Sequence, residues 1–451
     1  MLKKVLYILV IAGLIGSLLS CNPPYGPWPS NSCKNCHKIE VDKSHSLACT
    51  KCHKGDSNKY NKAGAHKGLI THPASIRNAK FFCEPCHKKE TNSVIKSTHY
   101  TLENEIKEIW TAFFPKSNPP SITQLKGISF PNNKKELLMD LLARRCLRCH
   151  VYYEGDDYEG TYRGLGCASC HMDSGKKKSH IFHKPKVANC LSCHYGNFVG
   201  WDFVGRFEKD YPEDFRAPLK NGRHLKRRYA IEWIDMSADI HFQKGLTCID
   251  CHTGKEFHPE KGKIGVISCK GCHKSISNRF GHQNSNFKIS CGSCHAKWGF
   301  YDFGQDLLRI DDPDPEDWSF LKVQTSSEIE MQKNSMTDKI HGNEYRGIWL
   351  KGYIKRRWWP VILGISKSGE IDVIRPILDI SISYLNQDDE VLFEKIRPIK
   401  SQTFSPLQNK LSSKKANNIW LPYTPHTIGK ADIFRTLFLK GLLNKKKGSN
   451  K

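Results

Sequence analysis

The residues best suited to chemistry in this sequence are cysteine and histidine, which occur 19 and 21 times in 451 residues. Eighteen of the cysteines form nine Cys-x-x-Cys pairs, and a histidine directly follows every pair. Cys21 is the one cysteine outside this pattern. The nine motifs are Cys33/Cys36-His37, Cys49/Cys52-His53, Cys83/Cys86-His87, Cys146/Cys149-His150, Cys167/Cys170-His171, Cys190/Cys193-His194, Cys248/Cys251-His252, Cys269/Cys272-His273 and Cys291/Cys294-His295.

This spacing suits covalent attachment of a porphyrin. Two thiols three positions apart lie on one helical turn, where each can form a thioether to a haem vinyl group, and the next residue offers an imidazole to the iron. Zinc sites and disulfides also use Cys-x-x-Cys pairs, but neither explains a histidine after all nine. The sequence therefore predicts nine c-type haems, held by the eighteen cysteines, with the motif histidines as proximal ligands.

The second axial ligand of each iron must come from outside the motifs. Twelve other histidines are present, and nine suffice if every iron has two imidazole ligands. Methionine is scarce and recurs at no fixed distance from a motif. The distal candidates are His45, His66, His72, His99, His180, His183, His241, His258 and His282, and the three others are His224, His341 and His426.

Two groups of three motifs have similar spacing. Those starting at Cys146, Cys167 and Cys190 resemble those starting at Cys248, Cys269 and Cys291, and the similar stretches 201–205 and 301–304 follow them. His180 lies nine residues after His171, as His282 does after His273. Duplication of a three-haem unit predicts that His180 and His282 are equivalent distal ligands, and coincidence of short spacings is the alternative.

The N-terminus has the pattern of an export signal. Lys3 and Lys4 precede an apolar run over residues 5–19, which is shorter than the roughly 20 residues of a spanning helix. The run ends in Leu-Ser-Cys, which resembles the lipobox of bacterial lipoproteins, so we expect acylation of Cys21. An uncleaved anchor helix is the alternative.

Motif spacing, prolines and charge divide the rest of the chain. Residues 113–135 contain four prolines and are expected to be irregular, and the acidic run 311–317 is expected to mark a boundary. Residues 361–365, 371–375 and 380–384 have the pattern of short strands. The predicted segments are a signal (1–20), a three-haem segment (21–110), a connector (111–139), a six-haem segment (140–304), an acidic linker (305–325), a β-rich domain without motifs (326–443) and a basic tail (444–451).

Composition agrees with a core built on cofactors. Apolar residues make up only 38% of the chain, and the formal net charge is +25. We therefore expect a mostly irregular fold with short α-helices packed around nine covalently bound haems, plus the small β-rich C-terminal domain. Haem propionates would neutralise most of the basic excess, so this charge requires no nucleic acid. The composition argues against a disordered chain, a polytopic membrane protein and an ordinary cytosolic enzyme.

These motifs resemble those of the large multihaem c-type cytochromes of bacterial and archaeal envelopes. The resemblance covers residues 21–304 and implies an electron carrier, lipid-anchored, in the periplasm or at the outer membrane. It also implies other redox proteins as donor and acceptor. No catalytic residue is predicted for such a relay. The alternative is a multihaem reductase with one open haem that acts on a small nitrogen or sulfur oxyanion. A polymerised cytochrome filament fits a lipid anchor poorly.

Overall fold

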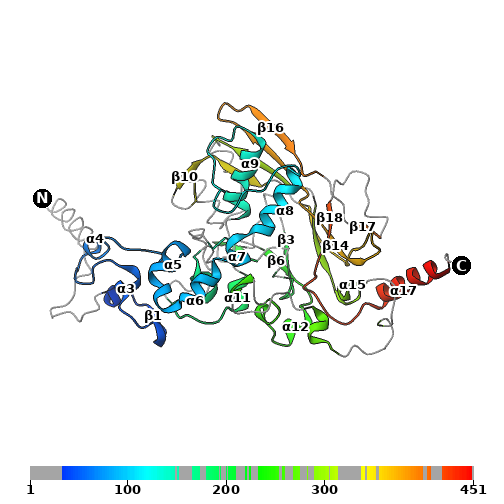
Figure 1. The fold of residues 1–451 in the computed structure, drawn as a ribbon, viewed down its shortest axis with the longest axis horizontal. Helices are drawn as coiled ribbons and strands as arrows, with labels where there is room; N and C mark the ends of the chain where they lie inside the picture. Colours follow the sequence, from blue (N-terminus) through cyan, green and yellow to red (C-terminus); the bar gives the residue numbers. More distant parts are fainter. Residues whose placement is uncertain are drawn as a thin grey trace.

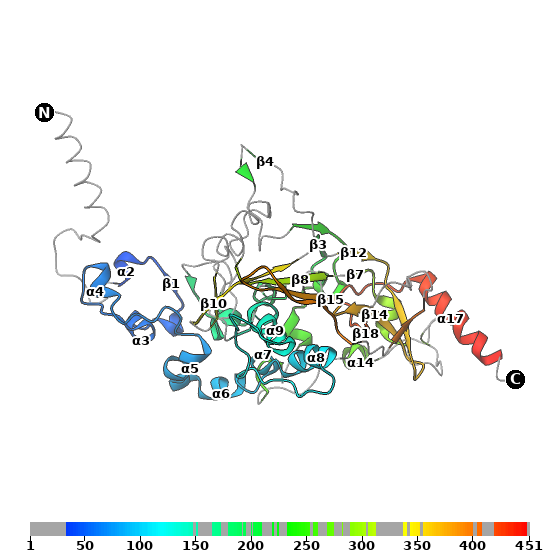
Figure 2. The same cartoon turned by 90° about the horizontal axis from the view of Figure 1, so that it is seen from above.

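The computed structural model describes most of the chain in separate stretches. These are residues 33–147, 150–151, 165–172, 179–191, 193–194, 200, 202–209, 219–220, 223–224, 232–252, 256–259, 268–274, 282, 289–303, 305–312, 337–340, 343–351, 355–399, 404–407 and 419–448. The predicted signal, Cys21, Cys149 and His341 lie outside these residues. The molecule is elongated, with α4 (Lys62–Ala65) and α17 (Ile433–Gly448) at opposite ends in both views (Figures 1 and 2).

Most motifs form a single helical turn, as the spacing of their cysteines predicts. Such turns are α2 (Cys33–Cys36), α3 (Cys49–His53), α10 (Cys167–His171), α13 (Cys248–Cys251), α14 (Cys269–Cys272) and α15 (Cys291–His295). The third motif lies where α5 (Ile76–Phe82) meets α6 (Glu84–Val94), and α6 is kinked at His87. The fourth motif begins at the end of η2 (Leu142–Cys146), a π-helical turn, and the sixth begins at the end of α11 (Val187–Cys190).

The remaining helices and small strands connect and brace the motifs. They are β1 (Glu40–Val41), η1 (Lys43–His45), α4 (Lys62–Ala65), α7 (Thr98–Thr101), α8 (Glu103–Phe113), α9 (Lys134–Leu141), β2 (Ser179–His180) and α12 (Ile240–Gln243). Strands β1 and β2 pair in parallel. The segment between the first and second motifs therefore meets the segment between the fifth and sixth. Between α8 and α9 the chain has neither helix nor strand, as the prolines predict.

Two four-stranded sheets dominate the C-terminal part. The first has the order β11-β8-β15-β16, from Ile348–Lys351, Gln305–Ile310, Ile380–Leu385 and Val391–Ile396, with β8 and β15 parallel. The second is antiparallel with the order β17-β13-β14-β18, from Phe404–Pro406, Leu363–Ser366, Ile371–Ile377 and Ile419–Pro422.

Four two-stranded pairs and a C-terminal helix complete the described structure. The pairs are β12-β7 (Lys355–Trp359 with Gly299–Phe303), β3-β6 (Arg206–Lys209 with Glu232–Asp235), β4-β5 (Leu219–Lys220 with Arg223–His224) and β10-β9 (Asn343–Arg346 with Thr337–Ile340), in addition to β1-β2. The C-terminal helix α17 spans Ile433–Gly448. None of the helices in the described part of the chain is long and apolar enough to cross a bilayer.

The largest side-chain core joins α8 and α9 to the first sheet. Ile106 and Trp110 of α8 pack with Leu138 of α9, and with Ile382 and Tyr384 of β15. All five are at most 3% exposed. The predicted connector and the predicted β-rich domain therefore share one hydrophobic core.

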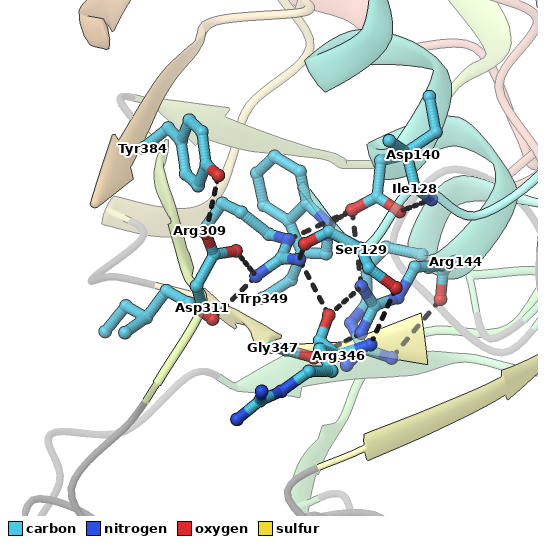
Figure 3. A network of polar contacts seen from close by, with 12 residues as sticks. Ile128, Ser129, Asp140, Arg144, Arg309, Asp311, Arg346, Gly347, Trp349 and Tyr384 are labelled. Atoms are coloured by element: carbon cyan, nitrogen blue, oxygen red, sulfur yellow. Dashed lines mark hydrogen bonds and ion pairs between the residues drawn. The ribbon is translucent and has the colours of Figure 1, made fainter. Parts of the chain in front are cut away.

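A buried ionic network fastens the same elements together (Figure 3). Arg144 and Arg309 are both fully buried and both contact the carboxylate of Asp140, at 3.4 and 3.1 Å. Arg309 also pairs with Asp311 at 2.9 Å, and Asp311 accepts a hydrogen bond from the Tyr384 hydroxyl. Because buried charges are costly unless paired, this network depends on every member.

The structure differs from the predicted organisation at three places. The predicted acidic linker begins as β8, in the interior of the first sheet, and Asp311 is 3% exposed. The predicted basic tail begins inside α17. The two similar stretches also differ, since residues 301–303 belong to β7 whereas residues 202–205 form a turn. Strand pairing on both sides of β8 and the ion pair between Arg309 and Asp311 explain the first difference, whereas residues 313–325 of the predicted linker lie outside the described residues.

Candidate haem-binding sites

The backbone of the described motif turns brings cysteine and histidine side chains together. In five motifs the histidine N–H donates to the carbonyl of the first cysteine at 2.8 Å, which closes one helical turn. The five are those of His37, His87, His194, His252 and His273. This turn places the two sulfurs and the imidazole on one side of the helix, as porphyrin attachment requires.

The second cysteines of three motifs need separate comment. Cys86 and Cys193 lie in their motif turns, where their N–H groups donate to the carbonyls of Cys83 and Cys190 at 3.1 and 3.2 Å. Cys86 is exposed, as Cys272 is, and Cys193 is only partly buried. Cys36 is disulfide-bonded, a state that thioether formation would exclude. Haem attachment at all eighteen motif cysteines stays a prediction that rests on the motif.

Eight of the nine motif histidines face the ring of a second histidine from another part of the chain. The ring-centre separations are 5.8 Å for His37–His66, 6.1 Å for His87–His45, 5.9 Å for His53–His180, 6.1 Å for His194–His99, 6.4 Å for His171–His258, 6.2 Å for His273–His241, 6.1 Å for His252–His426 and 6.1 Å for His295–His282.

These separations match the space that one iron would occupy. A metal–imidazole nitrogen distance of about 2.0 Å on each side sets the two ring centres roughly 6.3 Å apart. A direct stacking contact between imidazoles would bring the rings closer. The residues present therefore fit an iron held between two histidines at eight motifs.

Seven of the nine predicted distal candidates take part in these pairs, and two do not. The structure brings neither His72 nor His183 to a motif ring at this separation among the described residues. The carbonyl of His72 accepts from Asn78, and the carbonyl of His183 lies 3.0 Å from Nδ1 of His171. His426, which the candidate set omits, faces His252 instead.

The structure does not bring His180 and His282 to equivalent positions. His180 faces His53 of the second motif, whereas His282 faces His295 of the ninth. Neither pairs with the motif that lies nine residues before it. The short parallel pairing of β1 with β2 carries His180 toward the N-terminal segment, which a reading based on sequence spacing could not show.

Hydrogen bonds fix the orientation of several of these rings. Nδ1 of His53 lies 2.9 Å from the carbonyl of Ile70, and Nδ1 of His295 lies 3.0 Å from that of Gly429. A carbonyl only accepts, so Nδ1 carries the proton and Nε2 keeps its lone pair for a metal.

Three carboxylates also fix the orientation of a histidine ring, by a contact with its Nδ1. Nδ1 of His45 lies 2.9 Å from Asp42, and Nδ1 of His241 lies 2.8 Å from Asp239. Nδ1 of His252 lies 2.9 Å from Glu256. A carboxylate on Nδ1 raises the basicity of the imidazole as a ligand. Sequence reasoning missed Asp42 and Glu256, whose only signal is an acidic residue three or four positions from a histidine.

Glu256 connects two sites. Its backbone carbonyl lies 2.6 Å from Nδ1 of His99, and its carboxylate contacts His252. His99 faces His194 of the sixth motif, and His252 belongs to the seventh. The hydrogen bond from His252 lowers the pKa of the Glu256 carboxyl and raises the pKa of His252. One residue therefore orients a ligand at each of two neighbouring sites.

The sixth motif is electrostatically crowded. Desolvation and the neighbouring imidazoles of His99, His252 and His426 lower the pKa of His194 to about 4. His194 is consequently neutral at physiological pH, which is the state in which an imidazole binds metal.

His150 of the fourth motif has different surroundings in the described structure. Its ring centre lies 6.4 Å from that of Tyr100, and its Nε2 lies 2.5 Å from the Tyr100 carbonyl. Tyr100 follows His99 on α7, so the fourth motif lies beside the histidine that faces His194 of the sixth. Burial raises the pKa of the Tyr100 phenol.

Cysteines of different motifs also meet, and three hydrogen bonds join first cysteines of different motifs. The Cys83 thiol hydrogen-bonds with Cys167, Cys190 with Cys248, and Cys269 with Cys291. The hydrogen bond from Cys190 lowers the pKa of the Cys248 thiol to about 7. Because these sulfurs would carry porphyrin edges, the third and fifth, sixth and seventh, and eighth and ninth motifs would hold neighbouring haems.

Weaker interactions join these three pairs into a row. Cys52 interacts electrostatically with Cys83, Cys170 with Cys190, and Cys251 with Cys272. The order along the row is therefore the second, third, fifth, sixth, seventh, eighth and ninth motif. The fourth motif lies to the side of the sixth.

The N-terminal segment buries few apolar side chains. Between residues 33 and 99, Ala79 is the only buried apolar side chain. Leu47, Leu69 and Phe81 are 56%, 38% and 71% exposed there. Porphyrin faces would supply the missing apolar surface. Among the described residues, no three histidine, cysteine or acidic side chains are grouped as a site for a bare metal ion.

Comparisons with protein families, with curated proteins and with solved structures find no match to this chain.

Proposed function

We propose that this chain is a nonahaem c-type cytochrome that relays electrons in the cell envelope. The observation that carries the proposal is the set of eight histidine pairs whose ring centres lie 5.8 to 6.4 Å apart, each including a motif histidine. Sequence spacing brings only the motif histidine to each site, and the fold independently supplies the second. Neither a disulfide framework nor a set of zinc sites requires such pairs.

The chain's own residues would hold and orient each cofactor. The motif cysteines form the thioethers, the paired histidines bind the iron from both faces, and Asp42, Asp239 and Glu256 fix ring orientation. Each haem iron supplies reversible one-electron chemistry, and two nitrogen ligands favour electron transfer over substrate binding.

The contacts between motifs support a relay over a set of isolated centres. The three cysteine pairs and the interactions between them connect seven motifs without a gap. A carrier that moves charge over its length needs this continuity. An enzyme with one reacting centre does not need seven motifs in a row.

Haem content and iron spin state test this proposal on the purified protein. We expect nine haems per chain in a pyridine haemochromogen assay, and low-spin ferric signals in an electron paramagnetic resonance (EPR) spectrum of the oxidised protein. Markedly fewer haems would overturn the cofactor assignment. A high-spin ferric signal that nitrite or hydroxylamine alters would overturn the relay in favour of the reductase.

The proposed location is the envelope, with the chain anchored by lipid on Cys21, more specifically at the outer membrane. The proposed partners are an upstream electron donor and a downstream acceptor of the same compartment. We expect the Cys21→Ala variant to leave membranes that are washed at about 1 M salt, which screens charge-dependent peripheral contacts, whereas substitution of Ser20 by alanine should leave the protein membrane-bound. Retention of Cys21→Ala on the salt-washed membranes would contradict lipidation.

A further inference from the structure

Helix α17 presents an apolar surface that no described part of the chain covers. Ile433, Phe434, Leu437 and Phe438 are 69%, 85%, 50% and 43% exposed. Their spacing places them on one side of the helix, where they form a continuous patch. We call these four residues the α17 patch.

The other side of the helix is fastened to the ninth motif. Leu439 is 2% exposed and packs in the cluster that includes Cys294. Arg435 donates a hydrogen bond to the carbonyl of Ala296, and Asp432 N–H donates to the carbonyl of Cys294 at 2.8 Å. The patch therefore faces away from the cysteine that would carry the ninth haem.

The sequence around the patch carries a strong excess of positive charge. Between residues 430 and 451 the sequence has seven basic residues and a single acidic residue, Asp432. The acidic side chain is itself engaged with Arg435. Such a helix, apolar on one side and with lysines in its last turns, has the composition of segments that lie in the interface of an anionic bilayer.

Lysine favours a lipid surface over a protein partner. Protein interfaces are depleted in lysine at their centres, whereas membrane-surface helices are enriched in lysine beside phenylalanine and leucine. A helix of 16 residues is roughly 24 Å long, which suits a position in the interface plane.

We propose that α17 docks the C-terminal end of the molecule on an anionic membrane surface, through the α17 patch and the lysines that follow it. The ninth motif then lies close to the bilayer, at one end of the row of motifs. This contact is separate from acylation of Cys21, because α17 and the N-terminal motifs lie at opposite ends of the molecule (Figures 1 and 2).

Vesicle binding tests the proposal on the haem-loaded chain from Asn22 to Lys451, exported behind a cleavable leader so that no acyl chain contributes. The probes are vesicles of phosphatidylcholine alone and of phosphatidylcholine with phosphatidylglycerol. We expect binding to the anionic vesicles, and loss of most binding at about 1 M salt, where screening acts within about 3 Å.

Two double variants locate the contact. Phe434→Glu with Phe438→Glu should weaken binding by at least about tenfold, because it places two charges in the apolar patch. The matched control is Val391→Glu with Leu392→Glu on β16, where the side chains are 61% and 44% exposed. This control should bind as the unaltered chain does.

Three results would overturn the proposal. They are equal binding by both double variants, equal binding to neutral and anionic vesicles, and self-association that the Phe434/Phe438 variant abolishes. A haem count reduced to eight in that variant would likewise show that the patch covers porphyrin and not lipid. The haem count and spin state of the unaltered chain report on the relay separately, so failure of one proposal is distinguishable from failure of the other.

Discussion

At the scale of single residues, the motif histidines could be predicted and their partners could not. Attachment chemistry fixes the proximal histidine next to its cysteines, so one pentapeptide is sufficient to recognise it. The facing histidine is set by folding. His45 lies between the first two motifs but faces the third, and His241 lies before the seventh but faces the eighth. Only His282 faces the next motif along the chain.

His426 offers a direct test of this pairing. Replacing His426 with glycine should convert one low-spin ferric iron to high spin while the haem count stays at nine, because His252 would lose the ring that faces it. The matched control is His72→Gly, since His72 faces no motif ring among the described residues. An unchanged EPR spectrum in the His426 variant, or the same change in both variants, would contradict the assignment.

Glu256 should tune the site that contains His252. Its carboxylate contacts Nδ1 of that ring and makes the imidazole a stronger ligand for ferric iron. Glu256→Gln should raise the potential of one haem, by up to about 130 mV if a charged hydrogen bond of about 3 kcal/mol acts wholly on the ferric state. A redox titration followed by EPR measures this shift. Glu390→Gln, in an exposed turn, provides the control, and an unaltered set of potentials in Glu256→Gln would exclude the role.

At the scale of elements, several strands could be predicted from the sequence, but the distant residues that they contact could not. Residues 361–365, 371–375 and 380–384 do form or overlap β13, β14 and β15. Strand β8 escaped notice because it leads directly into an acidic, proline-rich run. Arg309 of this strand and Asp311 just after it are charged and yet buried, because they pair with each other and Arg309 also pairs with Asp140. Local composition carries no information about such a distant partner.

Asp140 should be the most sensitive member of that network. Asp140→Ala removes the carboxylate that contacts both buried arginines and accepts from the Trp349 indole at 2.8 Å. We expect a loss of about 3 to 5 kcal/mol in the free energy of unfolding, because charge is left unpaired inside the protein. Denaturant unfolding followed by circular dichroism measures this change. Asp388→Ala, in an exposed turn, should cost less than about 0.5 kcal/mol, and equal effects would contradict the role of the network.

At the scale of the whole molecule, two kinds of core stabilise one chain. Elements α8, α9 and the first sheet bury leucine, isoleucine and tryptophan in an ordinary side-chain core. Residues 33–99 bury only Ala79 among apolar side chains and offer ring pairs where iron would lie. The lean apolar composition of the full sequence averages these two parts, so it indicated cofactor burial without showing where side chains suffice.

The two cores should respond differently when the chain is produced without haem. The side-chain core needs no cofactor, so amide hydrogens of α8, α9 and β15 should remain protected from exchange. Residues 33–99 should exchange almost as an unfolded chain does, because their folding free energy depends on haem attachment. Hydrogen exchange measured by mass spectrometry on the haem-free and haem-loaded chains separates these outcomes. Equal protection of both parts in the haem-free chain would show that the motifs fold without a cofactor, and loss of protection in both would show that the side-chain core also depends on haem.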